Sequence, residues 1–192
     1  MEPRLTAAQA GRRAVYFVDA AHFVLGSFLG WLWCAAQLYI RAACGRQRYN
    51  VLGALNAVTG RLIRVTNQTY INAESVAELL RRVAAAHVFQ PVTVVLDNAR
   101  YQRCRLVQDL AEQLGIELLF LPSYSPNLNL IERLWKFVKK QALNNRHHTN
   151  YADFQARIDA CLDELTTTHR HELDALLTLR FQSFTNVSVL AA

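Results

Sequence analysis

Residues 91–121, PVTVVLDNARYQRCRLVQDLAEQLGIELLFL, decide the fold class of this 192-residue chain. The continuous apolar run from Val92 to Leu96 stops at Asp97 and is typical of a central strand buried on both faces. A helix is expected over residues 102–114, with Leu106, Val107, Leu110 and Leu114 at core spacing and Gly115 as its stop. Residues 116–121 are again apolar, so the unit predicts a strand, a right-handed crossover helix and a parallel strand. The chain is therefore expected to be α/β.

Three further strands are predicted before this unit. Residues 14–18 form an apolar strand that is expected to end at Asp19. Residues 49–58 and 61–66 flank Thr59 and Gly60, a two-residue punctuation that predicts an antiparallel hairpin. A helix follows over 73–87, with Asn72 as its N-cap. Residues 20–47 show no clear period and are expected to form a mostly buried irregular insertion or an extra hairpin.

The C-terminal third is predicted to be helical. After a turn-forming loop over 122–127, a long helix is expected from residue 128 or 129 to near 144, with Glu132 in its first turn. Its core face is formed by Ile131, Leu134, Trp135 and Val138. Two more helices are predicted over 151–165 and 171–179. No linker is evident, so we expect one domain: an N-terminal tail (1–13), a core (14–148) and a C-terminal helical extension of the same domain (149–192).

Composition limits the class of protein. The chain has 21 Lys and Arg against 15 Asp and Glu, a formal charge of +6, and its 52% hydrophobic content excludes a disordered basic tail. The charge alone leaves open a polyanionic partner or a solvated basic surface. Four separated cysteines without a Cys-x-x-Cys pair are expected to be buried thiols of a reducing compartment. The apolar segment 24–40 is interrupted by Gly26, Ser27, Gly30 and Gln37, so we expect a cytoplasmic protein with no membrane partner.

Three carboxylates stand where a site is expected. Asp19 and Asp97 each follow a predicted strand, and ligand crevices of open α/β sheets lie beyond the carboxyl ends of strands. The loop over 122–127 can bring Glu132 to the same place. Taken singly, Asp19 and Asp97 also fit turn residues, and Glu132 fits a favourable charge at a helix start. Together, three oxygen donors favour Mg²⁺ or Mn²⁺, and two such ions about 4 Å apart can promote phosphodiester cleavage.

Two motifs carry a family resemblance. The stretch VLDNARYQ over 95–102, followed by LPSYSPNLNLIERLW over 121–135, resembles the catalytic core of DDE transposases of the bacterial insertion-sequence-630 family, within the mariner superfamily. The 34 residues between Asp97 and Glu132 match the spacing typical of that family. The resemblance covers about residues 15–165. Many relatives have an acidic residue after the first aspartate, where this chain has Ala20.

The resemblance implies a ribonuclease H-like fold, with a mixed five-stranded sheet flanked by helices. It assigns Asp19, Asp97 and Glu132 as catalytic, metal-binding acids that hold two Mg²⁺ ions, for which Mn²⁺ can substitute. The implied function is DNA strand cleavage and transfer at transposon ends and target DNA, with insertion at TA. A homodimer on DNA, a separate or frameshifted N-terminal helix-turn-helix region and association with the bacterial nucleoid are also expected. The alternatives are a catalytically silent or co-opted DNA-binding remnant and a stand-alone nuclease of this fold.

Basic residues cluster beside the proposed metal site. From Glu132 to Asn150 there is no further acidic residue, and the positive charges there are Arg133, Lys136, Lys139, Lys140 and Arg146. Helical spacing places Lys136 and Lys139 on the Glu132 face. We expect Arg133, Lys136, Lys139 and Lys140, together with Arg46 and Arg48 beside the insertion, to bind DNA phosphates. His22 and Asn98 are expected either to orient a water or the scissile phosphate, or to make local hydrogen bonds only.

Overall fold

The computed structural model describes residues 1–26, 47–122, 125–144, 146, 148, 150–179 and 181. Its strands form one sheet in the order β3-β2-β1-β4-β5, and their bounds are β1 (Ala14–Val24), β2 (Arg48–Asn56), β3 (Leu62–Asn67), β4 (Val92–Leu96) and β5 (Ile116–Phe120). β2 is antiparallel to β1 and β3, whereas β4 is parallel to β1 and β5. The mixed five-stranded sheet confirms the fold class expected from the sequence.

Strand β1 continues past Asp19, so the prediction that it ends there is wrong. Its second half pairs with β2, from Asp19 opposite Gly53 to Val24 opposite Arg48. The physical reason is alternation: Ala21 and Phe23 are buried, while the residues between and after them are exposed. The first residues of the predicted irregular insertion are thus regular strand. Most of that insertion, including Trp31, Trp33 and Arg46, lies outside the described residues.

The β2–β3 hairpin is confirmed, although its loop is longer than two residues. The backbone N–H of Asn56 donates to the carbonyl of Arg61 at 2.9 Å and closes the loop over 57–60. The Asn56 side-chain oxygen accepts from the backbone N–H groups of Val58 and Thr59. Gly60 has φ +68°, a left-handed conformation that suits glycine.

Helices α2 (Ala73–Ala85) and α3 (Arg105–Gln113) cover one face of the sheet. The predicted N-cap of α2 is confirmed, because Asn72 accepts a hydrogen bond from the backbone N–H of Ser75. Helix α3 begins three residues later than predicted, since the preceding residues form turns. Its core contacts are Val107 and Ala111, and Leu106, predicted to be buried, is 52% exposed because it points about 100° away from Val107.

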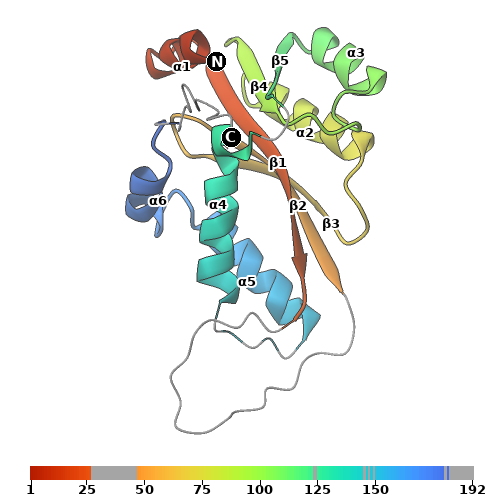
Figure 1. Cartoon of the computed structure of the whole chain (residues 1–192), viewed down its shortest axis with the longest axis vertical. Coiled ribbons are helices and arrows are strands. Elements are labelled where there is room, and N and C mark those ends of the chain that lie inside the picture. Colours follow the sequence, from red (N-terminus) through yellow and green to blue (C-terminus); the bar gives the residue numbers. More distant parts are fainter. Residues whose placement is uncertain are drawn as a thin grey trace, which may run out of the picture.

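The remaining helices lie against the opposite face, with α4 along β1 and α5 across the lower part of the sheet in Figure 1. They are α1 (Glu2–Gln9), α4 (Ile131–Val138), α5 (Tyr151–Asp163) and α6 (Arg170–Leu176). The predicted long helix is built in pieces: a 3₁₀ turn (η1, Pro126–Leu128), α4 and a π-helical segment (η2, Lys139–Leu143). Within the described part of the chain, no helix is long and apolar enough to cross a membrane.

Helix α1 is attached to the sheet through Glu117 on β5, the edge strand. Arg4 and Arg13 both form ion pairs with this carboxylate, and Thr93 donates a hydrogen bond to it at 2.9 Å. The hydrogen bond from Arg4 is the largest of several effects that lower the pKa of Glu117 to about 2. The residues before β1, predicted to form a tail, therefore contain a helix that is docked by charge.

We expect Glu117→Gln to lower the free energy of unfolding at pH 7 by about 0.5–1 kcal/mol, a small effect because the ion pair is partly solvated. A lowered folded-state pKa stabilises the protein above the unfolded-state value, and this contribution disappears as the pH falls from about 4.5 to about 2. Denaturant titrations at pH 7 and pH 3 should therefore show a gap between wild type and variant that is less than half as large at pH 3 as at pH 7. A gap of equal size at both pH values would contradict the assignment. Glu112→Gln, at an exposed position on α3, is the matched control.

Candidate active site

The register of β1 and β4 aligns Asp19 with Asp97. The parallel pairing places Phe17 opposite Val95, and each aspartate lies two residues further along its chain. Residues two apart on a strand point to the same face, and Phe17 and Val95 belong to the core beneath α4. The sequence prediction that these two acids meet at one place is supported by the strand pairing, although Asp19 reaches it from the middle of a strand.

Helix α4 brings Glu132 to the same face. Its apolar residues Ile131, Leu134 and Trp135 are buried against the sheet, while Glu132 is half-buried in the first turn. The segment before the helix is fastened to β1, because the Asn129 side chain donates to the carbonyl oxygen of Val18 at 3.3 Å. This bond fixes the start of α4 one residue away from Asp19 along β1.

We expect Asn129→Ala to lower the free energy of unfolding by about 1 kcal/mol, since Asn129 is 4% exposed and its hydrogen bond is lost. The same change should loosen the start of α4, which would appear as faster amide hydrogen exchange over residues 130–133. Gln113→Ala, at an exposed position that ends α3, provides the comparison. Unchanged exchange in the Asn129 variant would show that packing alone holds the start of the helix.

The surroundings of Asp19 disfavour its charged form. Burial is the main cause that raises the pKa of Asp19 to about 7; repulsion by Glu132 and Asp97 adds to it, and hydrogen bonds from the Ala20 backbone and the Trp135 indole act in the opposite direction. Among the described residues, none of the three acids forms an ion pair with Lys, Arg or His. A divalent cation would remove both the repulsion and the burial penalty.

The donor set fits Mg²⁺ or Mn²⁺. The three side chains offer only oxygen atoms, which are the ligands these ions prefer. One oxygen of Asp97 accepts a hydrogen bond from the backbone N–H of Ala99 at 3.2 Å, which orients the carboxylate by an Asx-type turn. Within the described residues, no three His, Cys, Asp or Glu side chains are close enough to enclose a metal ion. The three acids share one face of the sheet and repel one another, but their side chains are not arranged as a complete set of metal ligands.

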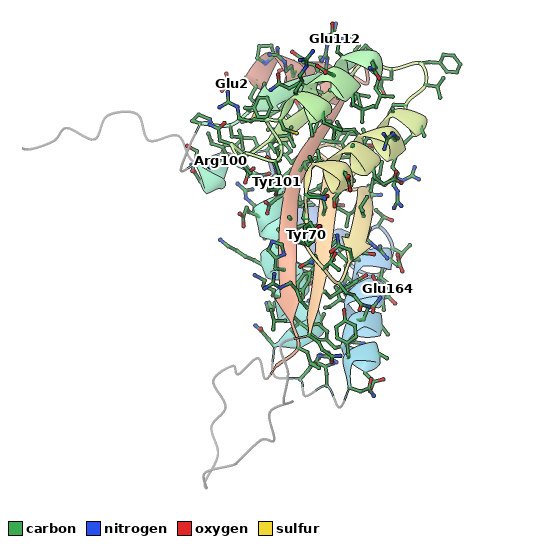
Figure 2. All side chains as sticks on the ribbon, turned by 90° about the vertical axis from the view of Figure 1, so that its right-hand side faces the viewer. Glu2, Tyr70, Arg100, Tyr101, Glu112 and Glu164 are labelled. Atoms are coloured by element: carbon green, nitrogen blue, oxygen red, sulfur yellow. The ribbon has the colours of Figure 1, made fainter. Side chains whose placement is uncertain are left out.

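Tyr101 is a site residue that the sequence analysis did not find. Tyr101, labelled in Figure 2, follows the turn after β4 and packs against the core on the α2 and α3 face of the sheet. Burial, followed by the negative charges of Asp97 and Asp19, raises its pKa to about 12. Its hydroxyl therefore keeps its proton near the two aspartates throughout the physiological range. Its place within the motif over 95–102, directly after the Asp97 turn, is the sequence signal that could have indicated it.

Asn98 and His22 are both expected next to the acids, but only Asn98 is found there. Asn98 is adjacent to Asp97, and its side-chain oxygen accepts a hydrogen bond from Arg103 at 2.8 Å. His22 is on β1, but it lies three positions beyond Asp19, so it points to the opposite face of the sheet. There its Nδ1 is 2.7 Å from the side-chain oxygen of Asn50. The structure does not bring His22 to the carboxylates.

The basic residues after Glu132 divide into two groups. Lys136, Lys139 and Lys140 are exposed, and no described acid pairs with them. Arg133 instead donates hydrogen bonds to the carbonyl oxygens of Leu176 and Thr178, at 3.3 and 2.7 Å, and so fastens the end of α6 to α4.

The basic surface is hollowed next to α6. Arg133, Lys136 and Lys140 line a hollow of about 320 Å³ together with Phe137, Glu172 and Leu176. Arg48 is exposed at the start of β2, where its register partner on β1 is Val24. Val24 lies five residues beyond Asp19, so the strand rise separates Arg48 from Asp19 by about 16 Å along the sheet. It can therefore contact only a more distant part of a ligand bound at the acids.

Comparisons with known proteins agree with this geometry. Residues 14–155 match the model of a family described as DDE superfamily endonuclease. The insertion element IS630 uncharacterized 39 kDa protein of Shigella sonnei is 26% identical over 125 residues, which are 64% of this chain and 36% of that protein.

Two solved structures show the same fold. The Mos1 mariner paired end complex with Mn superposes with a TM-score of 0.60 at 16% identity, over 92% of this chain and 57% of that chain. The catalytic core domain of BIV integrase superposes with a TM-score of 0.51 at 15% identity, over 80% of this chain and 84% of that chain. The chain thus spans about a third of the curated relative and little more than half of the Mos1 chain.

Proposed function

The chain belongs to the DDE superfamily endonucleases, and we propose that it is the catalytic domain of an insertion-sequence transposase. The observation that carries the proposal is the convergence of Asp19, Asp97 and Glu132 on one face of the sheet, from three separate segments. The similarity to the insertion element IS630 protein and to the Mos1 mariner complex supports a transposase.

The proposed reaction has two steps at phosphorus. In the first, a water oxygen forms a bond to the phosphorus of a DNA phosphodiester, and the bond to the 3′ oxygen breaks, leaving a 3′ hydroxyl and a 5′ phosphate. In the second, that 3′ hydroxyl attacks a phosphodiester of the target strand, and a new 3′ hydroxyl is released from the target. Each step replaces one phosphorus–oxygen bond by another, so no oxidant or other co-reactant is needed.

The chain's own residues have separate roles in this proposal. Asp19 and Asp97 would jointly hold the divalent cations, and Glu132 would complete the ligands of the second one. Two Mg²⁺ or Mn²⁺ ions held there would supply activation of the attacking oxygen and stabilisation of the leaving oxygen. Lys136, Lys139 and Lys140 hold the DNA backbone, and Asn98 and Tyr101 border the place where the scissile phosphate would bind.

The proposed partners are transposon ends and target DNA in a bacterial cell, with the protein acting beside the nucleoid. We further propose that two copies act together on DNA and that a helix-turn-helix region, from a preceding segment or from another polypeptide, recognises the transposon ends. Insertion at TA is part of the same proposal.

Nicking of a supercoiled plasmid tests the proposed chemistry. We expect the chain to convert supercoiled plasmid to the open circular form with Mg²⁺ or Mn²⁺ and to leave it intact with EDTA. Cleavage that is insensitive to EDTA, or no cleavage with either ion, would overturn the proposal. DNA binding without any cleavage would favour a co-opted DNA-binding domain instead.

A further inference from the structure

The indole of Trp135 makes a direct polar contact with the proposed metal-binding acid Asp19. Trp135 is in the middle of α4 and is 3% exposed. Its Nε1–H donates to Oδ2 of Asp19 at 3.0 Å, across the interface between the helix and the sheet. The N–H group is the only polar atom of the indole, so the contact fixes both the ring and the carboxylate.

The sheet is shaped to admit this ring. Gly53 on β2 is the register partner of Asp19 on β1. A Cβ atom added to Gly53 would lie 2.9 Å from Cη2 of Trp135 and 3.0 Å from Cδ1 of Ile131. The glycine therefore provides the space into which the far edge of the indole packs, while the opposite edge of the ring faces Asp19.

A third contact limits rotation of the ring. Phe23, four residues beyond Asp19 on the same face of β1, packs edge-on against Trp135 with ring centroids 6.4 Å apart. The indole is thus held between Gly53 and Phe23, and both are on strands that also carry or pair with Asp19. Any displacement of the ring changes the direction from which Oδ2 is held.

The nature of the donor matters for the acid. A Lys or Arg at this position would neutralise the carboxylate and compete with a cation, whereas the neutral indole leaves its full negative charge in place. Holding one oxygen also restricts rotation of the carboxylate, so the other oxygen has a defined direction. This arrangement resembles the way in which outer hydrogen bonds orient metal ligands in general.

We propose that Trp135 is a positioning residue that orients Asp19 for divalent cation binding, and that Gly53 is required because it makes room for the indole. The inference rests on the proposed function, since it assumes that Asp19 is a metal ligand. It assigns a site role to two residues that would otherwise be only packing residues.

Calorimetric titration of the chain with Mn²⁺, in the absence of DNA, tests this inference with two variants. Trp135→Phe keeps the aromatic packing and removes the donor, and Gly53→Ala keeps the donor and displaces the ring. We expect each to weaken Mn²⁺ binding about tenfold, and plasmid nicking by Trp135→Phe to recover at saturating Mn²⁺. Thermal unfolding identifies variants that fail to fold, and because the two changes act at different residues, either one suffices for the test.

A spectroscopic measurement adds an independent readout. The chain has three tryptophans, so Trp31→Phe with Trp33→Phe leaves Trp135 as the only indole. Its fluorescence should be quenched by Mn²⁺ with the midpoint found by calorimetry. If folded Trp135→Phe and Gly53→Ala bind Mn²⁺ like the wild type, the positioning role is wrong and the proposed function stands. If the wild type itself binds no Mn²⁺ and nicks no DNA, the proposed function fails as well.

Discussion

Replacing Asp97 by asparagine is expected to reduce metal-dependent plasmid nicking at least 1,000-fold, about 4 kcal/mol of transition-state stabilisation. Asn has nearly the same shape, and its side-chain oxygen can still accept the hydrogen bond that Ala99 donates to Asp97. The loss would therefore come from the missing negative charge of Asp97, one of the three carboxylates that meet on this face of the sheet. Initial rates of nicking at saturating Mg²⁺ and Mn²⁺ measure the effect.

Asp109→Asn is the matched control for this experiment. Asp109 is exposed on α3 and pairs with Arg105, so its replacement removes one negative charge on the opposite face of the sheet. Its nicking rate should equal that of the wild type. Equal rates for wild type, Asp97→Asn and Asp109→Asn would show that the observed cleavage comes from another site or from a contaminant.

The position of Asp19 shows how far the sequence could lead. The apolar run before Asp19 predicts a strand, which is present, and the charge of Asp19 predicts the end of that strand, which instead continues to Val24. Charge is a poor stop signal here because the alternation of buried and exposed residues continues through Ala21 and Phe23. The partner that explains the continuation is β2, which is distant in sequence, so local patterns could not reveal it.

The expected start of helix α3 is wrong for a different reason. Leu106 fits the apolar spacing expected for α3. However, turns occupy the residues before Arg105, so the helix begins later than expected, and its buried residues are Val107 and Ala111. Such turns depend on local hydrogen bonds, for example from Gln102 N–H to the Ala99 carbonyl, which composition does not indicate. By contrast, α2 was predicted well because Asn72 gives a clear capping signal.

The contacts around the acids could not be predicted from spacing. Trp135 was expected in the core and is buried there, but its hydrogen bond to Asp19 depends on the packing of α4 on the sheet. Gly53 carries no motif, and its role appears only from its position opposite Asp19 and beneath the indole. Tertiary packing across distant segments determines these details.

The structure also separates Arg133 from the lysines of the proposed DNA-binding surface. Arg133 was grouped with the lysines by charge, yet its guanidinium is bound to carbonyl oxygens at the end of α6. The three lysines of α4 and η2 remain exposed, and they are the only lysines of the whole chain. All other basic residues are arginines or histidines, so the amine groups of this protein, apart from its N-terminus, are concentrated beside Glu132.

The double variant Lys136→Ala/Lys139→Ala is expected to bind DNA at least tenfold more weakly at about 0.1 M salt, because two phosphate contacts are lost. The slope of log affinity against log salt should fall in magnitude by about 1.8, independently of DNA sequence. Arg81→Ala/Arg105→Ala, which removes two exposed charges from α2 and α3, should leave both quantities nearly unchanged. Fluorescence anisotropy over a range of salt concentrations measures both.

Because lysine occurs only at these three positions, amine-reactive labelling gives a direct test of the same surface in the unmodified chain. Acetylation of the free protein should modify all three lysines, which are exposed. Bound DNA should protect Lys136 and Lys139, since both share the helix face of Glu132. Equal labelling with and without DNA, under conditions where anisotropy shows saturation, would place the DNA elsewhere and would separate phosphate binding from the carboxylate site.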